Sequence, residues 1–214
     1  MKGSKYNYKT HWDNAYKNIS NENLGWFETN PVQSLELIEK CKLNKESILF
    51  NAGAGTSKLI NLLIKKGYEN IIINDISSIA LKKLENKIEY KSSIKFIQDD
   101  LTNPKKLLKI NKIDLWHDRA VLHFFREKYQ QKNYFNLLKK MVKKNGFVIL
   151  CEFNLNGAKK CCGLDIFNYN KEMLQEKLGK DFLLLESSDY TYNHPNNGNT
   201  REYIYTLFKR IKYN

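Results

Sequence analysis

The chain has 214 residues, of which 42% are hydrophobic and 13% aromatic, a composition that excludes wholesale disorder. This length fits one domain with a core that needs no disulfide or metal support. The net charge of +13 raises the question of nucleic-acid binding. However, only four of the 36 positive residues are arginines, which nucleic-acid sites favour. We therefore interpret the charge as lysines dispersed over solvated helix faces.

The sequence indicates neither a membrane segment nor a signal peptide. Its longest apolar runs fall far below the roughly 18 residues that a membrane helix needs. Residues 1–30 are polar and aromatic, without an apolar core. The cysteines have no C-x-x-C spacing, which argues against a zinc site or a disulfide framework. We expect a cytoplasmic protein with no bound metal, no membrane partner and free thiols at Cys41, Cys151, Cys161 and Cys162.

The apolar pattern predicts strands that alternate with helices along most of the chain. We expect strands at residues 48–51, 71–74, 94–97, 113–116 and 147–153. We expect helices at residues 56–66, 79–88 and 129–142, with Asn145 and Gly146 as the stop signal before the fifth strand. Alternation of this kind implies a parallel sheet with helices on both faces.

Two further strands are predicted at residues 182–187 and 203–209, with no helix between them. They have to pair antiparallel, because a parallel crossover needs a dozen or more residues and usually a helix. The expected fold class is α/β: a Rossmann-like, seven-stranded, mostly parallel sheet with an antiparallel last strand and helices on both faces. We expect a single domain, with residues 1–40 as an N-terminal lid or helical segment and residues 45–214 as the Rossmann-like core.

A glycine turn joins the first predicted strand to the following helix. Gly53 and Gly55 let the backbone approach a ligand closely, and Asp75, at the end of the second strand, is positioned to accept hydrogen bonds from a ribose diol. A dinucleotide fingerprint has a third glycine where this chain has Lys58. The turn therefore favours a single adenosine-type ligand, such as S-adenosylmethionine, over a dinucleotide.

Three local patterns carry a resemblance to a known family. They are His11-Trp12-Asp13 with Leu24-Gly25-Trp26-Phe27-Glu28, Asn51-Ala52-Gly53-Ala54-Gly55, and the segment from Ile113 to Val121 that contains Trp116-His117-Asp118-Arg119. By these patterns the chain resembles class I S-adenosylmethionine-dependent methyltransferases over nearly its whole length. Within that family it looks most like the small-molecule branch that contains thiopurine and thiol methyltransferases, which carry a similar Trp-Asp-Arg after the fourth strand.

The resemblance implies that S-adenosylmethionine binds at the carboxyl ends of the strands. Asn51 stands where the family often has an acid that holds the methionine ammonium group, and Glu28 is a candidate to compensate. Asp75 is expected to hold the ribose, with an N-cap to the next helix as the alternative. Asp100 is the first choice for the adenine amino group and Asp99 the second. The residues expected to contact the cofactor are Trp12, Trp26, Asn51, Gly53, Ala54, Gly55, Asp75, Ile76, Asp99, Asp100, Leu101 and His117.

Aromatic residues gather before the first strand, at Trp12, Tyr16, Trp26 and Phe27. A positively charged sulfonium is attracted to aromatic faces. The resemblance implies that this segment is a lid over the cofactor, and the alternative is a helix that simply packs onto the core.

The candidate catalytic residues are His117, Arg119 and His123. Methyl transfer is an in-line displacement that needs a positioned, deprotonated nucleophile. Arg119 is a candidate to stabilise an anionic nucleophile, and either histidine to take a proton from a neutral one. For His123 we favour a core histidine instead, and Arg119 has the alternative of an internal pair with Asp118.

The leading hypothesis is methyl transfer to a small soft nucleophile, above all a thiol such as methanethiol or a related thiol or selenol. Residues 156–164 form either one wall of the substrate pocket, with Cys162 near the substrate, or a plain surface loop. The alternatives are a protein-lysine or RNA methyltransferase and a non-catalytic RNA-binding module. An aminomethylating enzyme would carry an N-P-P-Y-like or D-P-P-Y-like tetrad after the fourth strand, which is missing here. We expect a small-molecule substrate, no nucleic-acid partner, and a monomer or homodimer.

Overall fold

The computed structural model describes residues 6–88 and 93–212. Its elements, with the short 3-10 turns labelled η, are α1 (Tyr8–Asn18), η1 (Asn21–Asn23), α2 (Val32–Lys40), β1 (Leu49–Ala52), α3 (Leu59–Lys65), β2 (Ile71–Asp75), α4 (Ser78–Glu85), β3 (Lys95–Gln98), η2 (Leu107–Lys109), β4 (Ile113–Arg119), η3 (Leu122–Phe124), α5 (Lys128–Met141), β5 (Val142–Phe153), β6 (Lys160–Cys161), β7 (Leu164–Asp165), α6 (Lys171–Leu178), β8 (Phe182–Asn193) and β9 (Thr200–Arg210).

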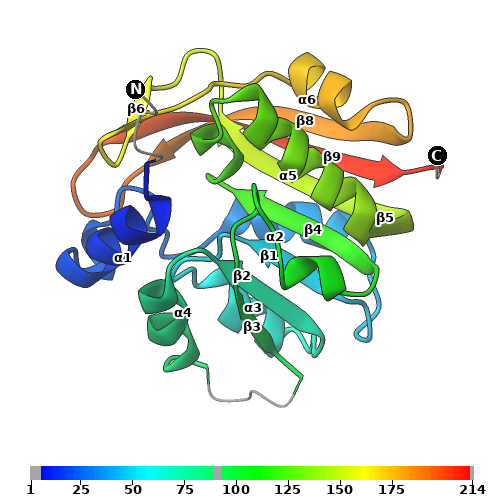
Figure 1. Cartoon of the computed structure of the whole chain (residues 1–214), viewed down its shortest axis with the longest axis horizontal. Helices are drawn as coiled ribbons and strands as arrows, with labels where there is room; N and C mark the ends of the chain where they lie inside the picture. The colour runs from blue at the N-terminus through cyan, green and yellow to red at the C-terminus, as the bar shows by residue number, and fades with distance from the viewer. Residues whose placement is uncertain (1–5, 89–92, 213–214) are drawn as a thin grey trace.

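The main sheet has seven strands in the order β3-β2-β1-β4-β5-β9-β8 (Figure 1). The first five are parallel, and β9 runs antiparallel to both of its neighbours. The predicted fold class is therefore confirmed. The central strand β1 is buried along its whole length, as expected for a strand covered on both faces.

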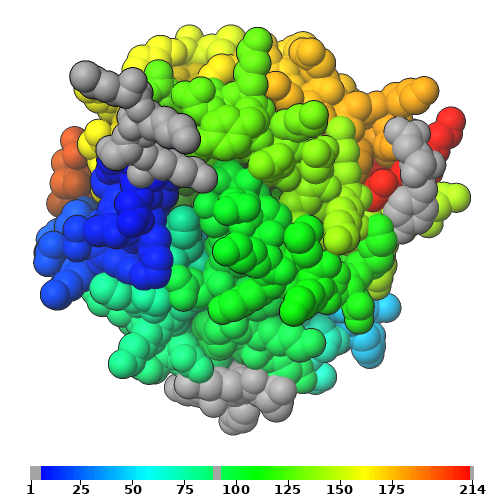
Figure 2. Space-filling view, in the orientation of Figure 1, coloured from blue at the N-terminus to red at the C-terminus, as the bar shows by residue number. Residues whose placement is uncertain are grey.

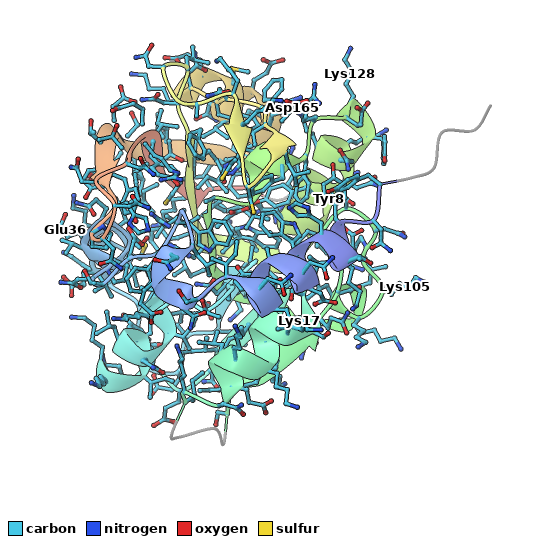
Figure 3. The ribbon with its side chains drawn as sticks, turned by 90° about the vertical axis from the view of Figure 1, so that its left-hand side faces the viewer. Tyr8, Lys17, Glu36, Lys105, Lys128 and Asp165 are labelled. Carbon is cyan, nitrogen blue, oxygen red and sulfur yellow. The ribbon has the colours of Figure 1, made fainter. Side chains whose placement is uncertain are left out.

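Helices from different parts of the chain cover the two faces of the sheet. The core on one face combines residues of α2, α3 and α4, and the core on the other combines residues of α5 and α6. The carboxyl ends of the parallel strands all meet at one edge, where α1 lies between α4 and the β6–β7 hairpin (Figures 1 and 3). This edge is where ligands bind in open parallel sheets.

Some predicted boundaries are wrong. Helix α5 ends at Met141 rather than at a stop signal formed by Asn145 and Gly146, and β5 begins at once with Val142. Its pairing with β4 jumps from Val142 to Phe147, which leaves an irregular stretch between them. Asn145 has a φ of +65° there, a conformation that asparagine tolerates better than most residues. The Asn-Gly pair therefore shapes a bulge inside the strand.

Other elements differ in length from the predictions. Helix α3 begins at Leu59, three residues later than expected, because the preceding residues form the glycine turn. Strand β4 continues to Arg119. His117, Asp118 and Arg119, which were expected to follow the strand, are therefore its last three residues. Strands β8 and β9 extend to Asn193 and back from Thr200, which makes a long hairpin.

Two segments before β1 pack over the carboxyl-end edge. Helix α1 lies against α4 on the surface of the molecule (Figure 2) and crosses the edge from Tyr8 to Lys17 (Figure 3). The front segment, residues 21–28, follows α1. Within residues 6–88 and 93–212, no helix has both the length and the apolar character needed to cross a membrane.

Candidate active site

Two adjoining cavities open at the carboxyl ends of the strands, with about 780 Å³ and 570 Å³ of space. Both volumes include space that is open to solvent. We call them the adenosine-side and methionine-side cavities, after the parts of the expected cofactor. Trp26, Gly53 and Arg119 line both, so the two spaces meet at these residues.

The glycine turn forms the floor where the cavities meet. Gly53 and Gly55 both have a φ of +54°, which a residue with a side chain rarely adopts. A Cβ at Gly53 would lie 2.3 Å from Val121 Cγ2, and one at Gly55 would lie 2.3 Å from Tyr16 Oη. Gly53 lines both cavities, whereas Gly55 lies beneath Tyr16 and is not among the lining residues.

Asp75 ends β2 at the adenosine-side cavity. Its Oδ2 accepts from the Gly55 backbone N–H at 2.8 Å, and its Oδ1 accepts from Ser77 N–H at 2.8 Å. Burial raises the pKa of Asp75 to about 6. The side chain that caps α4 is that of Ser77, so the N-cap alternative for Asp75 is wrong.

Asp99 and Asp100 follow β3 and differ in how far their carboxyl groups are engaged. Asp99 Oδ2 accepts from three successive backbone N–H groups, those of residues 105, 106 and 107, at 2.8–2.9 Å. Asp100 uses Oδ1 alone, which accepts from the backbone and the hydroxyl of Thr102 at 2.7 Å. Both residues line the adenosine-side cavity with Ile76 and Leu101. Asp100 has the greater capacity left for a ligand.

A buried polar chain stands at the methionine-side cavity. Asn51 Nδ2 donates to His117 Nδ1 at 3.1 Å, and His117 Nε2 lies 3.0 Å from Ser34 Oγ. All three side chains are buried, and burial together with the charge of Arg119 lowers the pKa of His117 to about 3. The imidazole is therefore neutral near pH 7 and has both nitrogens engaged. Asn51, Ala54 and His117 line this cavity.

Arg119 lies at the junction of the cavities and joins β4 to the front segment. Its Nε donates to Tyr205 Oη and its Nη1 donates to the Trp26 carbonyl, both at 3.1 Å. Its Nη2 lies 3.0 Å from Glu28 Oε1 in an ion pair whose geometry is not that of a hydrogen bond. The expected partner, Asp118, is thus replaced by Glu28.

Aromatic side chains enclose the remaining side of the adenosine-side cavity. Trp12 makes edge-on contacts with Trp26 and Phe124, with ring centroids 5.6 Å and 4.8 Å apart. Tyr16 and Cys161 line the same space, the latter from β6. Burial raises the pKa of the Cys161 thiol to about 11, so it stays protonated.

His123 lies apart from the predicted site. Its side chain is fully buried, and its Nδ1 lies 2.8 Å from Glu152 Oε2. It is not among the residues that line the two cavities. This placement favours the core interpretation of His123 over a catalytic one.

The structure adds several lining residues that the sequence did not indicate. Tyr8, Thr102, Ala120, Val121 and Phe125 line the adenosine-side cavity. Ala120 has a φ of +68°, which turns the chain back across the cavity and is not predictable from an alanine. No local signal marks these residues, because long-range packing brings them to the site.

The sheet order and a cavity at its carboxyl edge define the class of protein, which is a Rossmann-like methyltransferase fold. The profile of the methyltransferase domain family matches residues 43–208, and the chain belongs to that family. No curated protein matches the sequence.

Solved structures agree with this class. The fold is similar to that of an S-adenosylmethionine-dependent methyltransferase from Anabaena variabilis, with a TM-score of 0.77, 15% identity and 96% of each chain covered. It is also similar to a protein described for the conversion of a disulfide bond into a thioacetal group during echinomycin biosynthesis, with a TM-score of 0.72, 15% identity and 95% and 93% of the two chains covered.

A third similar structure is the 1,6-didemethyltoxoflavin-N1-methyltransferase of Burkholderia thailandensis, solved with its substrate and S-adenosylhomocysteine. Its TM-score is 0.65 at 11% identity, and 95% of this chain and 84% of that chain are covered. Together these findings confirm the expected class, a class I S-adenosylmethionine-dependent methyltransferase. The thiol branch stays a prediction.

Proposed function

We propose that the protein transfers a methyl group from S-adenosylmethionine to a small soft nucleophile, a thiol in the first instance. The continuity of the two cavities through Trp26, Gly53 and Arg119 carries the proposal. An elongated ligand with a nucleoside at one end and an amino acid at the other fits such a space. A side chain at Gly53 would collide with Val121, which lines the adenosine-side cavity, so a substitution there would disturb the cavity wall.

The residues present offer a group for each part of the cofactor. In this proposal Asp100 binds the adenine amino group and Asp75 accepts from the ribose hydroxyls. Asn51 and Glu28 stand at the methionine-side cavity, where they are available to the ammonium group. When bound, S-adenosylmethionine supplies a methyl carbon to which the acceptor sulfur bonds as the carbon–sulfonium bond breaks, which leaves S-adenosylhomocysteine.

The protonation of the site favours a soft acceptor. Among the described lining residues, His117 is the one histidine, and its pKa of about 3 with both nitrogens engaged makes it a poor base. An alcohol or an ammonium group would need such a base, whereas a thiol with a pKa near 8.5 ionises readily without one. Arg119, which is buried and cationic, lies where it would stabilise the thiolate.

The similar structures support this substrate class to different degrees. One of them belongs to a conversion of a disulfide into a thioacetal, which is chemistry at sulfur, and another methylates a ring nitrogen of a small molecule. A small-molecule substrate, a cytoplasmic location, no nucleic-acid partner and a monomer or homodimer remain part of the proposal.

Calorimetry with S-adenosylhomocysteine followed by an acceptor panel tests the proposal. We expect micromolar binding, and then methylation of small thiols but not of matched alcohols and amines. Glu176→Gln, at an exposed position of α6, should retain this activity. Binding without any thiol product, or product from amines or RNA instead, would contradict the thiol acceptor. A failure to bind S-adenosylhomocysteine would contradict the whole proposal.

A further inference from the structure

A cluster of buried polar side chains lies behind the cavity wall. Trp116 Nε1 donates to Tyr134 Oη at 3.0 Å, and Tyr134 Oη donates to Asp118 Oδ2 at 2.6 Å. The carboxyl group of Glu152 lies close enough to that of Asp118 to raise its pKa. None of these four side chains has exposed surface. Burial of so many polar groups costs free energy unless hydrogen bonds compensate for the lost contacts with water.

The two carboxyl groups each hold one backbone amide of the same turn. Asp118 Oδ1 accepts from Val121 N–H at 3.1 Å, and Glu152 Oε2 accepts from His123 N–H at 3.2 Å. The turn starts at Ala120, whose positive φ is unfavourable for a residue with a side chain. The turn therefore depends on the carboxyl groups for its shape.

Residues 120–125, which we call the wall turn, form one side of the adenosine-side cavity. Ala120, Val121, Phe124 and Phe125 all line it. Val121 also sets the clearance above Gly53, since an added Cβ there would lie 2.3 Å from its Cγ2. A shift of the wall turn thus changes the space at the junction of the cavities.

We propose that Asp118 and Glu152 are positioning residues, which hold the wall turn against Gly53 and so keep the cofactor cavity open in its binding shape. The inference rests on the proposed function, because it assigns this cavity to the cofactor. Neither carboxyl is among the residues that line the cavities, so both act through the turn.

The charge state of the pair makes the proposal testable. Two carboxyl groups in contact inside a protein cannot both ionise without strong repulsion. Burial raises the pKa of Glu152 to about 8 and holds the pKa of Asp118 well above its usual value. Above pH 8 the pair therefore gains negative charge as Glu152 ionises. The other titratable groups that face it are His123 from η3, Arg119 from the end of β4, Tyr134 from α5, Cys151 from β5 and Tyr169.

The test is the affinity for S-adenosylhomocysteine between pH 6.5 and 9.5, measured by calorimetry for the wild type, Glu152→Gln and a control, Glu176→Gln on the exposed face of α6. We expect the wild type and the control to lose affinity at least tenfold above pH 8, while Glu152→Gln changes much less. Titration of the ligand's own amino group affects all three proteins equally. Parallel curves for the wild type and Glu152→Gln would overturn the proposal.

A second readout separates this inference from the proposed function. If the wild type binds no S-adenosylhomocysteine at any pH, the proposed function fails, and near-ultraviolet circular dichroism of the ligand-free protein decides the positioning role. The tryptophan signal should then change above pH 8 in the wild type and not in Glu152→Gln. An unchanged wild-type signal overturns the inference. Asp118→Asn provides the same comparison if Glu152→Gln does not fold.

Discussion

At the scale of single residues, Asp75 serves the glycine turn and the proposed ligand at the same time. Each of its oxygens accepts one backbone N–H, from Gly55 and from Ser77. An ionised carboxylate has about four acceptor positions, so two remain for hydroxyl groups of a ligand. The Asp75 carboxylate therefore holds the glycine turn and has acceptor positions left for the ribose hydroxyls of the proposed ligand.

Asp75→Asn should weaken S-adenosylhomocysteine binding at least tenfold, because a hydrogen bond to a charged group contributes about 1.5–3 kcal/mol. The pKa of Asp75 is raised by burial to about 6, so wild-type affinity should fall as the pH drops from 7 to 5 and the carboxylate takes up a proton. The variant should not show this loss of affinity between pH 7 and pH 5. Calorimetry at pH 5, 6 and 7 measures both effects, with Glu176→Gln as the control. An equal loss of affinity between pH 7 and pH 5 in the wild type and the variant would show that Asp75 does not contact the ligand.

Asn51→Asp should destabilise the fold at pH 7 by about 1–3 kcal/mol, because it places a charged carboxylate in a buried position where the amide donates to His117 Nδ1. Burial raises the pKa of such a carboxyl, so the lost stability should return as the pH falls towards 5. Urea unfolding at both pH values measures this change. Asn156→Asp, at an exposed position, should behave like the wild type. Equal stability of both variants at pH 7 would contradict a donor role for Asn51.

A site residue can be predicted from the sequence when the pattern of its immediate neighbours marks its position. Asp75, Asp100 and His117 follow apolar strands, and the carboxyl ends of parallel strands meet at one edge. By contrast, Ser34 and Cys161 reach the site through contacts between distant elements. No spacing in the sequence records those contacts.

At the scale of elements, α1 is anchored as a cover over the site. Asp13 Oδ1 accepts from Ser77 Oγ at 2.7 Å and from Ile79 N–H at 3.3 Å, which ties α1 to the start of α4. Lys83 Nζ donates to the Tyr16 carbonyl from the same helix α4. Because Trp12 and Tyr16 line the adenosine-side cavity, release of α1 would expose that cavity.

Asp13→Ala should speed the dissociation of S-adenosylhomocysteine about five- to tenfold, since each lost hydrogen bond contributes on the order of 1 kcal/mol to holding α1 in place. Stopped-flow displacement measures this rate. The matched control is Lys17→Ala, an exposed side chain of the same helix. An unchanged dissociation rate in Asp13→Ala would show that α1 packs on the core without acting as a lid.

The order of the seven main strands and of α3, α4 and α5 was predictable because apolar periodicity is local, but their ends were not. Asn145 and Gly146 have the composition of a helix stop, yet they lie inside β5, where the pairing with β4 skips several residues. A bulge of this kind depends on the neighbouring strand. The sequence pattern therefore predicts that a strand is present better than where it starts.

At the scale of the whole molecule, two buried histidines and two buried acids oppose each other in the pH dependence of stability. Burial lowers the pKa values of His117 and His123 to about 3, so their contribution is present above pH 6.5 and is lost in acid. Burial raises the pKa of Glu152 to about 8, so its contribution is present in acid and is lost as the pH rises to 8. Well above pH 6.5 the histidines are neutral in both states, and the two buried acids, Glu152 and Asp118, set the slope.

The free energy of unfolding should therefore fall by on the order of 1–2 kcal/mol between pH 6.5 and 8. Glu152→Gln should flatten this slope, because the amide carries no proton to lose. Urea unfolding at pH 6.5, 7.25 and 8 measures the slope, with Glu176→Gln following the wild type. A wild-type slope of zero, or an identical slope in Glu152→Gln, would show that the Glu152 carboxyl does not hold its proton in the folded state.

The contacts of the front segment bear on the order in which the protein matures during synthesis. Tyr192 donates to the Phe27 carbonyl across a separation of 165 residues, and His194 contacts the Leu24 carbonyl across 170. Arg119 and Tyr205 complete the attachment through Trp26. The segment that walls the methionine-side cavity therefore leaves the ribosome early, but part of its attachment is missing until the β8–β9 hairpin has been translated. A nascent chain can form its central strands well before it can retain a methyl donor.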